Sequence, residues 1–235
     1  MSNWDTNRLN EWFVPKFGPT RFRIAIGILF LPYTAMCISF ALLGSLISPS
    51  IHWDRIVAIV LIYFFALGIG AHFADSIGSR KKPWGAEISI HASWIILALS
   101  LSVAYSIGIL YIIFFVPLLL VVAVAEGFFL FAYNFEKFGG RFHTNFWFVI
   151  AWGFLPVMAG FIMQTNGITL ESILVATVTG VISYVEISLS RPYKVLKSRG
   201  VQIDSVRTLE RYLKIISFGT LITAMLALAL RIIFY

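Results

Sequence analysis

The chain has 235 residues, of which 59% are hydrophobic and only 12% are charged, whereas ordinary soluble domains carry about 25% charged residues. This composition excludes a water-soluble globular domain and indicates a surface that faces lipid. The formal net charge of +7 does not indicate a nucleic-acid partner, because the basic residues fall in the connections between apolar segments. The single cysteine, Cys37, excludes an internal disulfide.

Residues 1–20 are polar and aromatic, with Trp4, Trp12 and Phe13 placed among charged residues. This pattern predicts an N-terminal segment that lies as a helix on the membrane surface. The alternative is a partly ordered tail. The segment is not typical of a cleavable signal, because it is too long and lacks a small-residue cleavage site.

Seven apolar stretches follow, each long enough to cross about 30 Å of hydrocarbon. They cover residues 24–48, 56–78, 88–107, 109–135, 144–164, 170–190 and 215–235. The third and fourth stretches are separated only by a break expected near Gly108. We therefore predict an all-α integral membrane bundle of about seven transmembrane helices, which forms one domain over residues 1–235.

The 18 Lys and Arg residues are unequally distributed between the two sides of this bundle. Sixteen of them lie before the first span or after the second, fourth and sixth spans, and only Arg55 and Arg231 lie on the other side. The positive-inside rule then predicts a multi-pass protein of the cell membrane with its N-terminus in the cytoplasm and its C-terminus outside.

The longest cytoplasmic connection is residues 191–214. Apolar residues alternate there with basic residues such as Lys194 and Arg199, and Gly200 lies near its middle. This pattern predicts a basic amphipathic loop that contains a surface helix broken at Gly200.

Polar residues close the second span. His72, Asp75 and Ser79 are spaced three and four residues apart, so they share one helix face. A carboxylate beside cations at the membrane mouth could hold Mg²⁺ against a phosphate, because Mg²⁺ takes one or two carboxylates and lets substrate oxygens complete its octahedron. A helix end whose acid simply pairs with Arg80 explains the pattern equally well.

Two carboxylates lie inside the predicted spans, where an unpaired charge is costly. Glu126 is about two to three turns from the cytoplasmic end of the fourth span and needs a partner, a cavity or a proton. Glu186 is nearer the cytoplasmic end of the sixth span, and an ion pair with Arg191 or with surface lysines would explain a carboxylate at this position.

Residues 132–143 connect two spans and combine paired glycines, 139 and 140, with Lys137 and Arg141. Such a loop could fold over a phosphate or a lipid headgroup. An ordinary tight turn would use the same glycines for their backbone freedom, and the two cations could serve only to fix the topology.

Several of these blocks resemble one family. Residues 70–80, Gly-Ala-His-Phe-Ala-Asp-Ser-Ile-Gly-Ser-Arg, followed by Lys82-Pro83 and residues 87–89, resemble the first aspartate-rich loop of the UbiA-type intramembrane prenyltransferases. Tyr133-Asn134, Lys137, the paired glycines and residues 151–161 resemble the middle region of that family. The blocks agree in order and spacing over about residues 20–200.

The departures from the family concern its metal sites. In UbiA-type enzymes two aspartate-rich loops hold Mg²⁺ on a prenyl diphosphate. Here the first loop keeps Asp75, with His72 and Ser79 at positions where Asn or Asp is expected, and no carboxylate lies between Glu186 and Asp204. The family also usually has nine helices.

The resemblance implies a protein that binds a prenyl diphosphate or an anionic lipid and transfers the prenyl group to an acceptor if it is active. Asp75 and His72 would be catalytic, and Asp75 would ligate Mg²⁺. The residues expected to contact the substrate are Arg80, Glu126, Tyr133, Asn134, Lys137, Arg141, Lys194 and Arg199. The basic residues would grip phosphate oxygens directly.

Two other functions remain open. A non-catalytic UbiA-like protein would bind a lipid or serve as a subunit of a membrane complex, and the missing second aspartate motif favours this alternative. A small transporter would use Glu126 and Glu186, but matched interrupted helices are not evident in the sequence. A retinal protein is excluded, because residues 215–235 contain no lysine for a Schiff base.

Overall fold

The regular structure is helical throughout. The computed structural model describes residues 9, 11–29, 31–78, 88–198 and 203–234, and these contain no strand. Six segments in the described ranges are long and apolar enough to cross a membrane. The expectation of a helical membrane protein is confirmed at this level.

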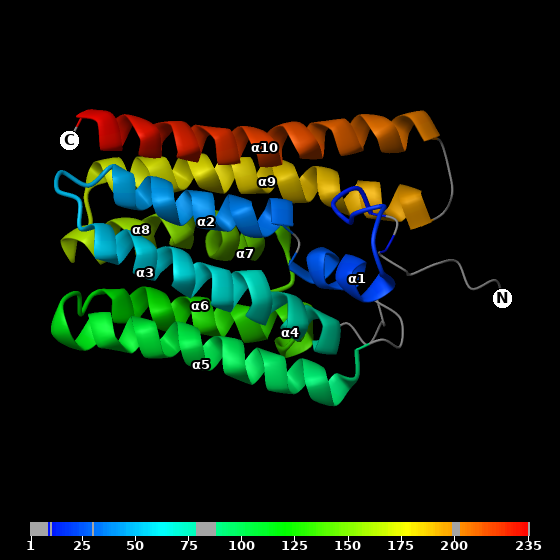
Figure 1. Cartoon of the computed structure of the whole chain (residues 1–235), viewed down its shortest axis with the longest axis horizontal. Coiled ribbons are helices and arrows are strands. Elements are labelled where there is room, and N and C mark those ends of the chain that lie inside the picture. Colours follow the sequence, from blue (N-terminus) through cyan, green and yellow to red (C-terminus); the bar gives the residue numbers. More distant parts are fainter. Residues whose placement is uncertain (1–8, 10, 30, 79–87, 199–202, 235) are drawn as a thin grey trace.

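Seven helical rods run along the long axis of the molecule (Figure 1). They are α2 (Leu31–Leu46), α3 (Trp53–Tyr63) continued by η2 (Phe64–Gly70) and α4 (Ala71–Gly78), α5 (Ile90–Phe114), α6 (Leu119–Asn134), α7 (Asn145–Val149) continued by η4 (Ile150–Phe154) and α8 (Leu155–Thr165), α9 (Leu170–Ser198) and α10 (Ile203–Phe234). Of these, α6 is short, and its 16 residues extend about 24 Å.

The bundle has two unlike ends. At the basic end lie α1 (Thr20–Leu29), the end of α4, the last turns of α9 and the first turns of α10 (Figure 1). At the far end lie the connections 47–52, 115–118 and 166–169. The described chain starts at the basic end and finishes at the far end, as an odd number of crossings requires.

The centre of the bundle depends on close contact between α2 and α8. A Cβ atom added at Gly44 would meet the carbonyl of Val157, and one added at Gly160 would meet the carbonyl of Ala41. Ser45 Oγ donates a hydrogen bond of 3.1 Å to the Gly160 carbonyl across the same contact. Small residues let helix backbones approach closely where the surrounding lipid supplies no hydrophobic driving force.

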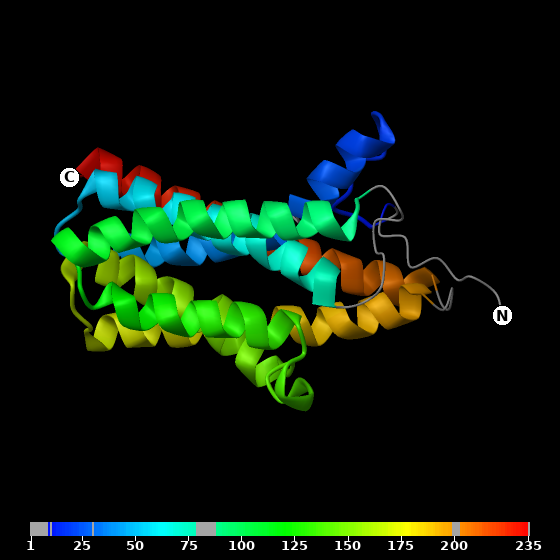
Figure 2. The ribbon, with the colours of Figure 1, turned by 90° about the horizontal axis from the view of Figure 1, so that it is seen from below.

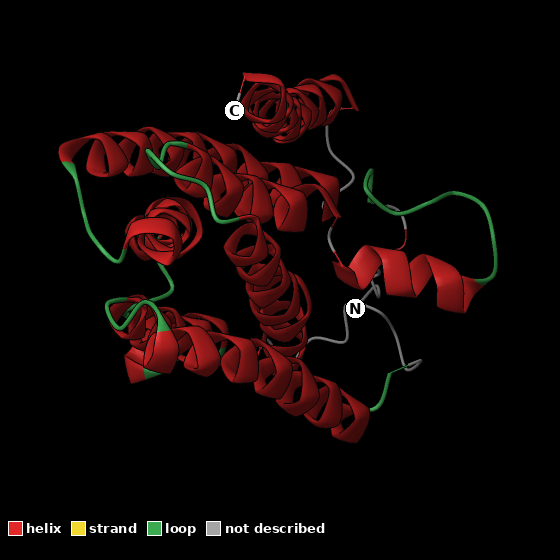
Figure 3. Cartoon of the chain, turned by 60° about the vertical axis from the view of Figure 1, so that its left-hand side comes forward, coloured by secondary structure: helices red, strands yellow, loops and turns green. Residues whose placement is uncertain are grey.

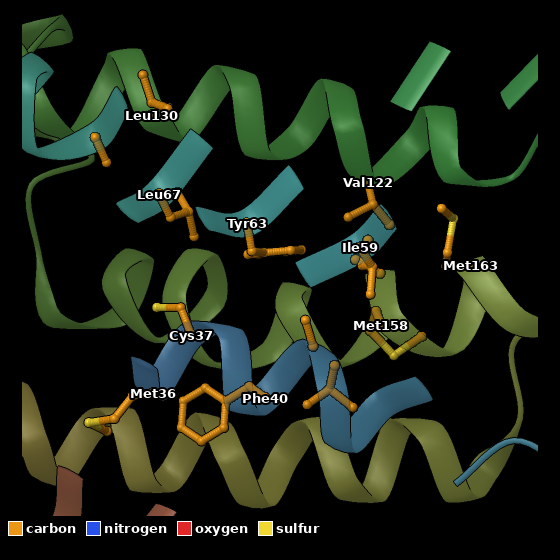
Figure 4. Packing of buried hydrophobic residues seen from close by; sticks show 14 of the residues in the cluster. Met36, Cys37, Phe40, Ile59, Tyr63, Leu67, Val122, Leu130, Met158 and Met163 are labelled. Atoms are coloured by element: carbon orange, nitrogen blue, oxygen red, sulfur yellow. The ribbon is translucent and has the colours of Figure 1, made fainter. Parts of the chain in front are cut away.

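The interior is apolar and so is most of the outer surface. Phe40 of α2 and Met158 and Met163 of α8 are among the residues buried in this interior (Figure 4). Large apolar side chains are also exposed along α5, α6, α9 and α10, and α10 lies at the edge of the bundle (Figure 3), packed on α2 and α9. Lipid is the solvent that such a surface requires.

Two rods contain a π-helical segment, η2 and η4. A π turn accommodates an extra residue and shifts the backbone hydrogen bonds. Neighbouring side chains contact carbonyls in η4: Thr179 Oγ1 donates to the Gly153 carbonyl at 2.8 Å, and Cys37 Sγ lies 3.7 Å from the Trp152 carbonyl. The segment is thus fixed by packing partners on α9 and α2.

The break expected near Gly108 is wrong. The α5 helix runs through this position, where Gly108 is buried and lies beside Ile62. The chain turns instead at residues 115–118, where Pro117 has no N–H to continue the helix. One glycine costs a helix only about 1 kcal/mol, which the packing of this rod offsets.

The start of the chain also differs from the expectation. The described residues 11–19 form turns and not a surface helix, because Pro15, Gly18 and Pro19 interrupt helical geometry. The helix outside the bundle is α1, which includes residues assigned to the first span. It leaves the bundle laterally at the basic end (Figure 2), with Ile24 and Ile28 buried.

The basic segment 191–214 is not a separate surface helix in its described part. Residues 191–198 continue α9 and residues 203–214 begin α10. The Tyr193 hydroxyl on α9 lies 3.5 Å from Glu210 Oε2 on α10, so the two extensions contact each other beyond the apolar spans. The break expected at Gly200 lies outside the described residues.

Candidate functional site at the basic end

The α4 helix carries two of the predicted site residues into the bundle. His72 Nε2 lies 3.4 Å from Thr34 Oγ1 on α2, and the Thr34 hydroxyl also donates to the Leu29 carbonyl. This close packing requires glycine at position 68, where a Cβ would lie 2.7 Å from the Thr34 methyl carbon. The π segment η2 directly precedes α4 and therefore sets the direction in which His72 and Asp75 point.

A second close contact joins α4 to α6. A Cβ atom at Gly78 would meet the carbonyl of Asn134, so the two helix ends touch. This contact brings Asp75 into electrostatic interaction with Tyr133, whose side chain is buried. Asn134 is also buried, and its amide donates to the Leu130 carbonyl at 2.7 Å. One N–H of the Asn134 amide is therefore used within the last turn of α6.

Arg191 reaches the same place from α9. Its guanidinium contacts the Tyr133 side chain and donates to the His143 carbonyl at 3.5 Å. The His143 ring stacks on Tyr133 with centroids 4.4 Å apart, and its Nδ1 lies 3.0 Å from the Tyr133 carbonyl. Asp75, Tyr133, His143 and Arg191, together with His72, form what we call the inner cluster.

Glu186 lies one turn before Arg191 and is 2% exposed. It interacts with the Tyr33 hydroxyl and with the charge of Lys194, which is itself exposed. Of the two ion partners expected for Glu186, a surface lysine is the one that the structure brings close.

Two further predicted cations, both in the described part of the chain, lie apart from the inner cluster. Lys137 and Arg141 are exposed on the loop between α6 and α7, which juts from the bundle (Figure 2). Gly139 and Gly140 have φ values of 65° and 76°, which agrees with a tight turn that uses their backbone freedom. Arg80, Ser79 and Arg199 lie outside the described residues.

That loop packs through aromatic rings. Phe128 and Phe142 are 4.9 Å apart in an edge contact, Phe142 and Trp147 are 5.2 Å apart, and Phe138 is exposed. Aromatic residues beside cations are typical of the membrane–water interface. Lys137 and Arg141 are better explained as interfacial residues than as ligands of a bound phosphate.

Sequence reasoning missed a polar cluster that fastens residues 9–19 to the tips of α9 and α10. Glu11 Oε2 accepts hydrogen bonds from Tyr193 at 2.8 Å and from Lys197 at 2.9 Å. Lys214 lies over the Trp12 ring at 5.6 Å, and Arg23 donates to two carbonyls of the segment. No local signal could reveal contacts between residues about 180 positions apart. Burial among these cations lowers the pKa of Lys16.

Glu126 is placed apart from the inner cluster. It lies eight residues before Asn134 on α6, or about 12 Å along the helix axis. The Tyr63 hydroxyl donates to Glu126 Oε1 at 2.9 Å, and a small apolar cavity adjoins this pair. The structure thus separates Glu126 from the residues with which the sequence grouped it.

Whether the expected Mg²⁺ fits this site can be judged from the side chains that could bind it. Within residues 9, 11–29, 31–78, 88–198 and 203–234, no three His, Cys, Asp or Glu side chains are grouped as a metal site requires. The inner cluster offers the Asp75 carboxylate, which interacts with the same Tyr133 side chain that the Arg191 guanidinium contacts. One carboxylate fits Mg²⁺ only where phosphate oxygens and water supply the other ligands.

Comparison with known proteins gives no match to any protein-family model, curated protein or solved structure.

Proposed function

We propose that this membrane protein binds the diphosphate of a prenyl diphosphate, or a chemically similar anionic lipid headgroup, at the inner cluster. The observation that carries the proposal is the position of Arg191 inside the basic end, in contact with Tyr133, which also interacts with Asp75. A guanidinium forms paired hydrogen bonds with phosphate oxygens. Lys194, one turn further along α9, adds positive charge at the entrance.

The rest of the ligand would lie among apolar side chains. A prenyl chain is hydrocarbon, and the bundle offers apolar surfaces both inside and on its lipid face. This arrangement, with a charged head at the basic end and an apolar tail along the helices, matches the amphipathic shape of isoprenoid diphosphates. It is also what the resemblance to UbiA-type prenyltransferases implies.

Transfer of the prenyl group is a further step of the proposal. Mg²⁺ bound between Asp75 and the diphosphate would supply charge neutralisation as the diphosphate leaves. The chain's own residues would bind and orient the head: Arg191 would contact its oxygens, and the Tyr133 hydroxyl would lie beside them. Since the second aspartate motif is absent, binding without transfer is the alternative for the same site.

The test measures thermal protection of the purified chain in detergent by geranylgeranyl diphosphate. Arg191→Gln should weaken binding at least tenfold, because a charge-assisted contact is lost. Arg141→Gln is the matched control: it removes the same charge from the exposed loop and should change binding less than twofold. Circular dichroism and size-exclusion chromatography verify the fold of both variants.

Equal protection of Arg191→Gln and the unmodified chain would contradict the proposal. A second comparison separates the possible headgroups. Protection by inorganic diphosphate as well indicates that the phosphate itself is recognised, whereas protection by phosphatidylglycerol alone would overturn the prenyl diphosphate assignment and favour an anionic lipid. Release of diphosphate in the presence of an acceptor extract would then report transfer.

A further inference from the structure

A second site lies deeper in the membrane-spanning part. A cavity of about 70 Å³ is enclosed by α3 and η2, α5, α6 and one residue of α8. Small residues on these rods leave the space, among them Ala104, Gly108, Ala123 and Gly127. Ile59, Tyr63 and Val122 border it and lie near one another in the interior (Figure 4).

Glu126 supplies a carboxyl group to the otherwise largely apolar wall of this cavity. Its Oε1 accepts the hydrogen bond from Tyr63, whereas its Oε2 is buried and has no hydrogen-bond partner among the described residues. The hydroxyl of Tyr105, at the α5–α6 side, already donates to the Ala123 carbonyl at 3.2 Å. One polar atom is therefore left to be satisfied next to an apolar space.

An oxygen in this position is costly to leave unpaired. An unmade hydrogen bond on a buried polar group costs about 1–3 kcal/mol, and an apolar cavity does not hold water well. Residues near the membrane centre that carry such a cost mark functional sites by default. A ligand that fits this cavity and pairs with the carboxyl oxygen would be apolar except for one hydrogen-bonding group.

The position of the cavity indicates the route of entry. It lies directly beneath the α5–α6 surface, where Val103, Ile109, Val121 and Val124 are exposed and apolar. A ligand dissolved in the membrane can reach it between these helices without crossing water. A charged headgroup would have no counterpart on this surface.

We infer that the cavity binds the hydroxyl end of a neutral, membrane-dissolved long-chain alcohol, with its hydroxyl on Glu126 Oε2 and its chain leaving between α5 and α6. A hydroxyl both donates and accepts, so it pairs with this oxygen whether the carboxyl group is protonated or ionised. The site is independent of the inner cluster and shares no residue with it.

The experiment uses the full chain in detergent with two probes, farnesol and the hydrocarbon farnesene. Farnesene keeps the chain but has no oxygen, so it can neither donate nor accept a hydrogen bond. Farnesol should bind about tenfold more tightly than farnesene, as the loss of one buried hydrogen bond predicts. Equal affinity for the two probes would overturn the inference, because the carboxyl oxygen would then recognise nothing.

Three variants sharpen the result. Glu126→Leu should abolish the preference for farnesol, whereas Glu126→Gln, which keeps a hydrogen-bonding group of the same shape, should retain it within a few-fold. Ala123→Leu should fill the cavity and weaken both probes. An unchanged preference in Glu126→Leu, or unchanged binding in Ala123→Leu, would overturn the inference.

A last comparison tests the neutrality of the ligand. Farnesylamine is cationic and would pair with an ionised carboxylate. If it binds more than tenfold tighter than farnesol, and Glu126→Gln loses it, the site is a cation site and the inference is wrong. Val178→Leu, on the exposed face of α9 and away from the cavity, is the matched control and should leave every affinity unchanged.

Discussion

The two ends of the bundle use polar side chains differently. At the far end these groups hydrogen-bond the backbone of neighbouring rods: Gln164 pairs with both the N–H and the carbonyl of His52, Arg55 donates to the Met163 and Gln164 carbonyls, and Asn166 accepts from the Leu118 N–H. At the basic end, Glu11, Tyr193 and Lys197 contact one another across rods, and so do Tyr133 and Arg191, although some cations such as Arg23 also donate to carbonyls.

The difference between the two ends distinguishes side chains that stabilise the bundle from side chains that could bind a ligand. A side chain whose donors are occupied by helix carbonyls serves to close the bundle, and it has little left to offer a ligand. Cations grouped with acids and a tyrosine hydroxyl can exchange partners when an anion arrives. The far end is therefore expected to determine stability, and the basic end to determine binding.

The largest effect expected concerns the sides of the membrane on which the two ends lie. Ser50→Cys, at the far end, should react completely with a membrane-impermeant maleimide applied from outside, and Ser198→Cys, at the end of α9, should not react in intact cells. The reason is the unequal distribution of Lys and Arg. The buried Cys37 should give no background. Labelling of Ser198→Cys but not of Ser50→Cys would contradict the predicted orientation of the protein in the membrane.

The next largest effect is on stability. Gln164→Leu removes both hydrogen bonds to the backbone of His52 and should lower the free energy of unfolding by about 1–2 kcal/mol. Binding of geranylgeranyl diphosphate should stay the same. Thermal unfolding in detergent measures the first and ligand protection the second. Ser50→Ala, whose side chain is exposed at the same end, is the control.

If Gln164→Leu weakened ligand binding as much as Arg191→Gln does, the division of labour between the two ends would be wrong. If both variants lowered stability equally and neither changed binding, the inner cluster would be a structural feature of the same kind as the far end.

A smaller effect is expected at Asp75. Asp75→Asn should reduce the Mg²⁺-dependent part of the protection by geranylgeranyl diphosphate several-fold, because the carboxylate is the retained metal ligand of the first motif. Protection measured with a chelator should be unaffected. Should the unmodified chain be protected equally with and without Mg²⁺, direct binding by Arg191 would explain the site and the metal would have no part in it.

The smallest effect is expected where the N-terminal segment meets α9. Glu11→Gln removes the charge that pairs with Lys197 at 2.9 Å, and such a partly exposed pair contributes about 0.5–1 kcal/mol. Trypsin should cleave after Lys16 faster in the variant, and added salt should reduce the difference. Glu136→Gln, which removes an exposed acid of the same end, should leave cleavage unchanged.

The sequence predicted the helical class and the number of rods because span length and hydropathy are local properties. It misplaced the turn between α5 and α6. Glycine and proline can both interrupt a helix, and only the packing shows that Gly108 is buried inside α5 whereas Pro117 lies in the turn. It also could not show that α9 and α10 continue beyond their apolar parts, because Tyr193 and Glu210 stabilise those turns by tertiary contact.

The candidate site was predicted in part. The grouping of His72, Asp75 and Tyr133 near one end followed from their places near helix ends, and the structure does bring Asp75 and Tyr133 together. The sequence placed Lys137 and Arg141 with them, because charge and spacing do not reveal which side of a loop faces inward. It offered Arg191 as a partner of Glu186 and as part of the basic segment, and it could not show that Arg191 contacts Tyr133 and His143.

The π segment η2 makes the chemistry of α4 depend on where the chain length changes. In an α-helix each residue turns the following ones by roughly 100°, and a π turn absorbs one residue more than an α turn does. Loss of a single residue between Phe64 and Gly70 would relax the segment toward an α-helix, and His72 and Asp75 would keep their direction. Loss of a single residue within α3 has no such compensation and would turn His72 and Asp75 by roughly 100° relative to the packed part of α3. Two deletions that a hydropathy profile would hardly distinguish could thus preserve or dismantle the inner cluster, according to the side of Phe64 on which they fall.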